Sequence, residues 1–238
     1  MPPGADIARN LDSVRRRLTA AAHRANRSPT DIQLVAVSKN FPADHVRAAA
    51  AAGQRAFGEN RVQEALPKIE ALRDLPLDWH LIGHLQSNKA RKAAAFQWIE
   101  SIDRVELLER VDRAAADAGA TPDVLIQVDL AGEATKFGAR EADVSRLVQA
   151  ALGASAVRLA GLMLIPPYGD TPEASRPWFR RLRALRDDLV GDGLPAERLS
   201  QLSMGMSHDF EIAIEEGATI VRVGTAIFGE RPYPEARP

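Results

Sequence analysis

The 238-residue chain contains no cysteine, which excludes a disulfide framework, a thiolate zinc site and a cysteine nucleophile. It also lacks an apolar run long enough to span a bilayer and an N-terminal leader in which charged residues precede an apolar stretch. The formal net charge is only −1, so the overall charge does not favour nucleic acid or an anionic membrane as a partner. We therefore expect a cytoplasmic protein, and this expectation depends on the missing leader.

Short apolar stretches alternate with helical patterns along the chain. Strands are predicted at residues 32–38, 55–60, 79–83, 98–102, 124–130, 157–164, 199–203 and 219–223. Helices are predicted at residues 5–26, 43–52, 62–72, 105–118, 141–152, 172–190 and 207–216, with a last one from about Thr225. Ser87 or Asn88 is expected to cap the helix after the third strand.

This alternation predicts a parallel sheet. Eight units in about 240 residues match a closed (β/α)8 barrel better than an open doubly wound sheet, which is the alternative that periodicity alone leaves. We predict an α/β protein with a single TIM-barrel domain over residues 1–238. The extra helix at residues 5–26 would cover the bottom or the side of the barrel.

Residues 34–39, LVAVSK, end an apolar run on a single lysine. A short, β-branched run of this kind predicts a strand buried on both faces, with Lys39 at its carboxyl end. Lysine is rarely fully buried, so Lys39 either extends to solvent or is held there for chemistry. Taken alone, the residue favours the first interpretation, because charged residues commonly end strands.

The loops after the last two predicted strands, SMGMSHD (203–209) and RVGTAIFG (222–229), combine glycine with hydroxyl residues at the start of a helix. Glycine lets backbone N–H groups approach an anion, the start of a helix favours phosphate, and barrels bind phosphate in these two loops. Capping by Ser207 and Asp209 and a plain turn at Gly224 are the ordinary alternatives. No GxxxxGK[ST] loop is present. Together the two loops predict a phosphate site.

In a closed barrel the eighth strand pairs with the first, so Lys39 and these loops are expected at the same end of neighbouring strands. A ligand with an aldehyde near one end and a phosphate near the other would reach both. Pyridoxal 5'-phosphate has this shape, and we interpret Lys39 as the amine for its aldehyde, with Arg222 facing the pyridine ring. A phosphosugar enzyme with an imine-forming Lys39 is the alternative without the cofactor.

Seven long motifs run through the chain in order: LVAVSK (34–39), FGENRVQEA (57–65), WHLIGHLQSNK (79–89), GEATKFG (132–138), GLMLIP (161–166), LSMGMSHDFEIAI (202–214) and RVGTAIFGER (222–231). With these motifs the chain resembles the pyridoxal phosphate homeostasis proteins (the YggS/PROSC family). The resemblance implies the pyridoxal-phosphate barrel (fold type III) shared with the N-terminal domain of alanine racemase. It further implies a Schiff-base lysine at Lys39, the partner of the pyridine nitrogen at Arg222, phosphate contacts at Ser207, Gly224 and Thr225, and pocket positions at Asn60, His84 and Met163.

Arg222 stays charged and offers only hydrogen-bond donors, so it should leave the pyridine nitrogen unprotonated and weaken the electron sink that a pyridoxal-phosphate enzyme needs. Racemisation also needs bases on both faces of the substrate. The related racemase takes a tyrosine from a second domain, before which this chain ends, and nothing places Tyr168 or Tyr233 opposite Lys39. We therefore predict little or no racemase activity.

The leading hypothesis is pyridoxal phosphate homeostasis: the protein holds the cofactor as a Schiff base on Lys39, buffers its aldehyde and delivers it to apo-enzymes. Effects on amino-acid metabolism would then be indirect. A monomer is expected, with the cofactor and apo-forms of pyridoxal-phosphate enzymes as partners. Lys136 is a candidate second amine for the transfer, with a solvated surface lysine as the alternative. An amino-acid racemase of low activity is the alternative function.

Overall fold

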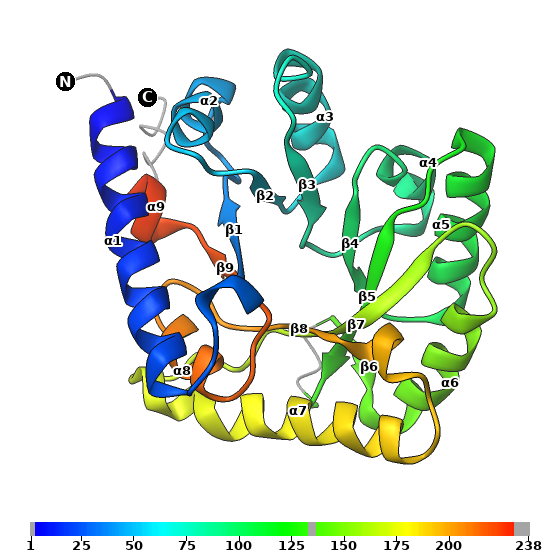
Figure 1. Ribbon diagram of the computed structural model, residues 1–238. Helices are drawn as coiled ribbons and strands as arrows, with labels where there is room; N and C mark the ends of the chain where they lie inside the picture. The colour runs from blue at the N-terminus through cyan, green and yellow to red at the C-terminus, as the bar shows by residue number, and fades with distance from the viewer. Residues whose placement is uncertain (1–2, 133–136, 231–238) are drawn as a thin grey trace, which may run out of the picture.

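The computed structural model describes residues 3–132 and 137–230, and within them eight parallel strands close into a barrel (Figure 1). The order around the ring is β4-β3-β2-β1-β9-β8-β7-β5, and pairing of β4 with β5 closes it. The strands are β1 (Gln33–Val37), β2 (Ala56–Glu59), β3 (Asp78–Leu81), β4 (Trp98–Ile102), β5 (Asp123–Asp129), β7 (Arg158–Leu164), β8 (Gln201–Ser203) and β9 (Ile220–Val223). The predicted closed (β/α)8 barrel is therefore confirmed.

Helices surround the ring and lie close to the predicted ranges. They are α1 (Pro3–Arg24), α2 (Ala43–Ala51), α3 (Val62–Ala71), α4 (Ala90–Ala93), α5 (Val105–Ala118), α6 (Glu141–Leu152), α7 (Arg176–Gly191), α8 (Phe210–Glu215) and α9 (Thr225–Phe228). A helix after the third strand was expected without bounds, and the short α4 lies there, whereas the two-residue strand β6 (Ala139–Arg140), which pairs with β5, was not predicted. Neither segment is long enough to show a hydrophobic period.

The predicted cap at Ser87 or Asn88 is wrong. Both residues lie inside a 3₁₀ turn, Ser87–Lys89, which begins after Gln86 and has no side-chain cap. The hydroxyl of Ser87 instead accepts a hydrogen bond from Arg104 Nη2 at 2.8 Å. The Ser87 hydroxyl, which could have capped the helix, thus binds Arg104 instead.

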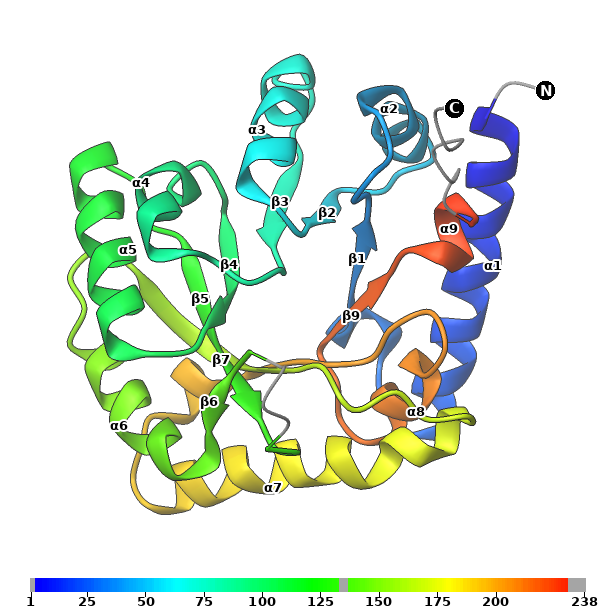
Figure 2. The ribbon, with the colours of Figure 1, turned by 180° about the vertical axis from the view of Figure 1, so that it is seen from behind.

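The N-terminal helix α1 covers the side of the barrel, where it packs against α2, α8 and α9 (Figures 1 and 2). Its predicted apolar stripe, Ile7, Leu11, Val14 and Leu18, is at most 6% exposed. Removing such side chains from water stabilises the fold by about 1.5–3 kcal/mol each. The extra helix is therefore part of the core.

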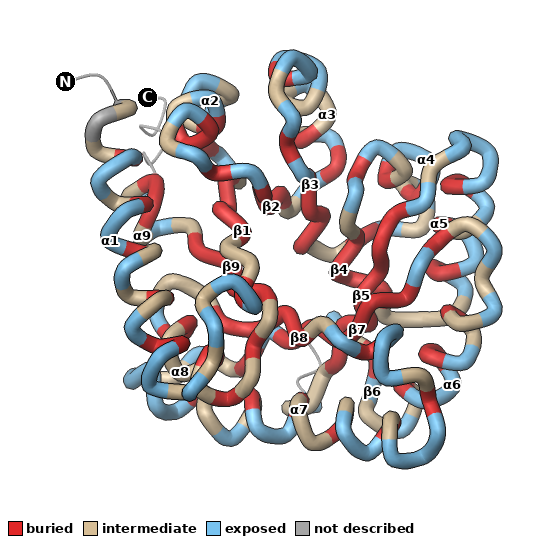
Figure 3. The backbone as a smooth tube through the Cα atoms, viewed as in Figure 1, coloured by how far each residue is buried: buried red, intermediate tan, exposed pale blue. Residues whose placement is uncertain are grey.

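Burial is concentrated in the strands, while the outward faces of the helices are exposed (Figure 3). Inside the barrel, apolar side chains form a small cluster of their own, made of Val35, Ala56, Leu125, Ala160, Met163 and Ile220. Among the described residues, no helix combines the length and the apolar character that crossing a membrane requires.

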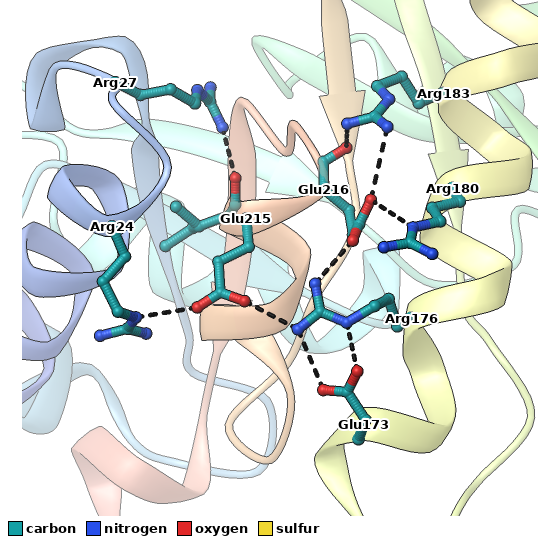
Figure 4. Close-up of polar contacts among 9 residues, drawn as sticks. Arg24, Arg27, Glu173, Arg176, Arg180, Arg183, Glu215 and Glu216 are labelled. Atoms are coloured by element: carbon teal, nitrogen blue, oxygen red, sulfur yellow. Dashed lines mark hydrogen bonds and ion pairs between the residues drawn. The ribbon is translucent and has the colours of Figure 1, made fainter.

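A network of arginines and glutamates joins α8 to the helices on both sides of it (Figure 4). Arg176 of α7 donates to Glu216 at 2.6 Å and to Glu215 at 2.8 Å, and Arg24 of α1 donates to Glu215 at 2.9 Å. Isolated surface ion pairs contribute little, but the Glu216 side chain is only 5% exposed and contacts three arginines of α7. The network therefore connects α1 to α7 through the end of α8.

We expect Glu216→Gln to lower the free energy of unfolding by about 1–3 kcal/mol at pH 7, because it removes the charge from a buried, hydrogen-bonded carboxylate. Burial alone would raise the pKa of Glu216, but the hydrogen bonds from Arg176 and Arg180 outweigh it and hold that pKa below its ordinary value of 4.5. A depressed pKa contributes stability above the unfolded pKa, and this contribution disappears as the pH falls through the folded pKa. The free energies of unfolding of wild type and Glu216→Gln, measured with urea, should therefore become equal at acidic pH.

Glu173→Gln is the matched control, since Glu173 pairs with the same Arg176 but its side chain is 63% exposed. At pH 7 it should cost less stability than Glu216→Gln. Equal losses for the two variants would contradict the dependence on burial.

Candidate functional site

A cavity of about 540 Å³ opens at the carboxyl ends of the barrel strands. Seven of the eight predicted cofactor residues line it: Lys39, Asn60, His84, Ser207, Arg222, Gly224 and Thr225. They come from the ends of five different strands or the loops that follow them, which the closed ring brings to one face. As contacts to a cofactor these residues remain a prediction.

The eighth predicted residue, Met163, lies elsewhere. It is fully buried in the apolar cluster inside the barrel, beside Val35, Leu125 and Ile220, and is not among the described residues that line the cavity. A simple packing role accounts for this position. Lys136 lies outside the described residues.

Lys39 leaves the barrel through a tight turn at the end of β1. Ser38 is still held in the sheet, because its N–H donates to the carbonyl of Gly58 at 3.0 Å, and its own carbonyl accepts from the N–H of Phe41 at 3.1 Å. Asn40 adopts a left-handed conformation, with φ of +66°, which asparagine tolerates better than most residues. The turn places the half-buried Lys39 on the wall of the cavity.

A buried cluster outside the ring anchors this turn. Ser38 Oγ donates to Glu59 Oε1 at 2.6 Å, and Lys68 Nζ of α3 donates to the Ser38 carbonyl at 2.8 Å. Lys68 also pairs with Glu59, whose side chain is fully buried. Sequence reasoning missed this cluster, although a glutamate inside the predicted strand 55–60 was a signal that a cation must lie nearby. The backbone that carries Lys39 is therefore fixed from behind.

The two glycine-containing loops meet as predicted. Ser207 Oγ, from the loop after β8, accepts hydrogen bonds from the N–H groups of Gly224 at 3.2 Å and Ala226 at 3.3 Å, at the start of α9. Ser207 therefore does not cap its own helix α8, and the ordinary capping interpretation is wrong for this residue. The two N–H groups and the hydroxyl form a polar cup, in which the hydroxyl accepts both bonds and keeps its own proton to donate to an anion.

The loop before α8 holds its shape through Gly205 and Asp209. Gly205 has φ of +93°, and a Cβ there would lie 2.5 Å from that of Ala213. Asp209 accepts from the Met206 N–H at 2.7 Å and from Ser175 Oγ at 2.7 Å, so its carboxylate closes the loop. This arrangement positions Ser207 at the cup.

Arg222 lies at the floor of the cavity and is 3% exposed. Its Nη1 donates to Ser203 Oγ at 2.6 Å and its Nη2 donates to the carbonyl of Leu164 at 2.8 Å. Burial lowers the pKa of Arg222, and the charges of Glu100 and Asp209 oppose this effect. Arginine remains protonated in proteins, so Arg222 presents a fixed cation.

Glu100 is the buried counter-charge that sequence reasoning missed. Its Oε1 lies 2.6 Å from His80 Nδ1, its Oε2 accepts from Ser203 Oγ at 2.5 Å, and Arg222 Nη1 is 3.9 Å away. Burial would raise the pKa of Glu100, but the hydrogen bond and charge of His80 and the charge of Arg222 outweigh it and lower that pKa. The glutamate within the predicted strand 98–102 was a signal that a buried charge needed a partner. The sequence did not show which residues its partners are.

His84 forms an aromatic wall of the cavity. Its ring stacks on Phe137 with centroids 3.6 Å apart and planes 11° apart. Burial lowers the pKa of His84, and Asp103, whose Oδ2 is 3.6 Å from Nδ1, opposes this effect. Tyr168, by contrast, is 85% exposed and lies outside the group of described residues that line the cavity.

The chemistry of the cavity suits a small ligand with a carbonyl group and an anionic group. The amine of Lys39 supplies a nucleophile, the Ser207 hydroxyl of the cup supplies a donor for an anion, and Arg222 supplies a cation. The volume falls within the range of about 300–1,000 Å³ that is usual for small-molecule pockets. Across residues 3–132 and 137–230, no group of three or more histidine, aspartate or glutamate side chains is placed to hold a metal ion.

Comparison with known proteins gives a consistent result. The model of the family "Alanine racemase, N-terminal domain" matches residues 9–232. A pyridoxal phosphate homeostasis protein of Aquifex aeolicus is 46% identical over 224 residues, covering 94% of this chain and 97% of that protein. Another, from Pseudomonas aeruginosa, is 47% identical over 230 residues, covering 95% and 96% of the two chains.

Solved structures show the same likeness. PipY of Synechococcus elongatus, determined with pyridoxal phosphate bound, is 45% identical, has a TM-score of 0.83, and is matched over 94% of this chain and all of that chain. An alanine racemase of Clostridium difficile, only 14% identical, has a TM-score of 0.72 over 98% of this chain and 59% of its own, which shows a shared fold alone. The chain therefore belongs to the pyridoxal phosphate homeostasis protein family, whose barrel is that of the alanine racemase N-terminal domain.

Proposed function

We propose that the protein binds pyridoxal 5'-phosphate and serves its homeostasis in the cytoplasm as a monomeric carrier. The observation that carries the proposal is the single cavity that joins Lys39, Arg222 and the polar cup. Pyridoxal phosphate supplies an aldehyde, a ring nitrogen and a phosphate, one group for each of these features. The relatives named for pyridoxal phosphate homeostasis support the same assignment.

Each residue then has a defined task. The Lys39 amine condenses with the aldehyde to a Schiff base, and one water leaves. Ser207, Gly224 and Thr225 receive the phosphate, and Arg222 donates a hydrogen bond to the ring nitrogen. Asn60 and His84 line the remaining wall of the cavity.

Arg222 also argues for a carrier over an enzyme. Its donors face two acceptors below the cavity, and arginine does not give up its proton, so it cannot keep a pyridine nitrogen protonated. A racemase further needs a second base opposite the lysine; Tyr168 does not line the cavity, and Tyr233 lies outside the described residues. We therefore propose storage and delivery to apo-enzymes, with racemisation of low activity as the competing function.

The Schiff base is tested by the absorbance of the purified protein with pyridoxal phosphate, followed by borohydride reduction and peptide mapping. Wild type should develop the visible band of a protonated Schiff base, with the adduct on Lys39, and Lys39→Ala should lose both. Lys89→Ala, which removes an amine from the loop after β3, is the control and should retain them. No band in wild type, or an equal band in Lys39→Ala, would contradict the Schiff base on Lys39 and favour the alternative of a phosphosugar enzyme.

The polar cup is tested by comparing pyridoxal phosphate with pyridoxal, which has no phosphate. Ser207→Ala should weaken binding of pyridoxal phosphate about tenfold and leave pyridoxal nearly unchanged, because one hydrogen bond to a charged group is lost. Titration of both ligands by fluorescence gives the ratio of dissociation constants. A ratio that equals that of wild type would place the phosphate elsewhere.

Carrier and racemase are separated by two assays on one preparation. The loaded protein should restore activity to an apo-enzyme that requires pyridoxal phosphate, while D- and L-alanine should not interconvert or exchange their α-hydrogen with deuterium oxide. Turnover of about 1 s⁻¹ or more, which is ordinary for enzymes, would contradict the carrier proposal.

A further inference from the structure

Below the cavity, four polar side chains form a continuous buried chain across the inside of the barrel. His80 of β3, Glu100 of β4 and Ser203 of β8 are fully buried, and Arg222 of β9 is 3% exposed. Hydrogen bonds of 2.5–2.6 Å join successive members. Arg222 alone among the four lines the cavity, so the chain reaches the ligand through it.

Each hydrogen bond in this chain has only one possible donor, and the donations converge on Glu100 from both sides. A guanidinium only donates and a carboxylate only accepts. Ser203 therefore accepts from Arg222 and must turn its own proton toward Glu100. For the same reason the proton of His80 that faces Glu100 lies on Nδ1. The orientations of the Ser203 hydroxyl and the His80 ring thus depend on Glu100, which accepts a hydrogen bond from each of them.

Arg222 is consequently held at two points. Nη1 is engaged by Ser203 and Nη2 by the carbonyl of Leu164 at the end of β7, on the neighbouring side of the ring. These two bonds fix the plane of the guanidinium and engage its terminal nitrogens below the cavity. Of the five N–H groups of the guanidinium, the Nε–H and one further N–H on each terminal nitrogen remain outside these two bonds.

We propose that Glu100 is a positioning residue which, through Ser203, orients Arg222 so that the site selects a ligand ring with an unprotonated nitrogen acceptor. The inference rests on the proposed binding of pyridoxal phosphate and adds what the floor of the cavity recognises. Stability alone does not account for the chain, because replacing buried ion pairs by apolar residues is often neutral or stabilising. The orientation that Glu100 imposes on Arg222 accounts better for a buried glutamate beneath the cavity.

The test compares two ligands, pyridoxal phosphate and 1-deazapyridoxal phosphate, in which a C–H group replaces the ring nitrogen. Wild type should bind the first about tenfold or more tightly, because only the first accepts a hydrogen bond from a charged donor. Glu100→Gln removes the negative charge that lies 3.9 Å from Arg222 Nη1 and replaces one acceptor oxygen with an amide donor. Ser203 or His80 must then reorient, and Arg222 is no longer held by a counter-charge. The preference should fall to within about threefold of unity.

Glu59→Gln is the matched control. Glu59 is as buried as Glu100, but its partners are Ser38 and Lys68, and it is not joined to Arg222. General loosening of the barrel should weaken both ligands equally, so Glu59→Gln should keep the wild-type preference. A merely structural role for Glu100 predicts the same unchanged preference in Glu100→Gln, and that result would overturn the inference.

Circular dichroism and unfolding curves establish that each variant is folded. If Glu100→Gln does not fold, Ser203→Ala carries the test, since it removes the acceptor of Arg222 Nη1 without burying a new donor. A reduced preference in Ser203→Ala supports the inference, and an unchanged one overturns it. Wild type that forms the Lys39 Schiff base but binds both ligands equally also overturns it. Failure of wild type to bind either ligand removes the proposed function itself.

Discussion

The parallel pairing of β1 with β9 is the constraint on which the rest of the site depends. In this register Val35 lies opposite Arg222 and Ala36 opposite Val223. Both strands therefore end at the same level, and Lys39 leaves β1 where Gly224 leaves β9. The pairing joins the first strand of the chain to the last, so the amine, the cation and the polar cup come together only when the ring has closed.

The inside of the barrel is divided into two layers by the same closure. An apolar cluster that includes Met163 and Leu125 fills one layer, and a polar chain led by Glu100 and Arg222 lies beneath the cavity. Burying the charge of Glu100 or of Arg222 alone would destabilise the fold, and the opposite charge of the partner offsets this cost. Arginine only donates hydrogen bonds and a carboxylate only accepts them, so the polar layer has a single hydrogen-bond arrangement. The floor of the cavity therefore presents a cation, Arg222, in a fixed orientation.

The outer helices also contribute to the site. The loop that supplies Ser207 leads directly into α8, and α8 is held between α1 and α7 by Glu215 and Glu216 with their arginine partners. Packing at the surface thus sets the position of the polar cup. This accounts for an N-terminal helix that precedes the barrel but is buried along its whole apolar stripe.

The sequence by itself determined the alternation of strands and helices, because β-branched runs and helical periods are local patterns. It also placed Lys39 at the end of a buried strand, and its motifs identified the family. Only the tertiary structure decided that Ser207 bonds to the start of α9, that Met163 packs below the cavity, and that Glu100 and His80 support Arg222. These contacts join residues far apart in the chain, and they depend on strand register and ring closure, which local periodicity does not encode.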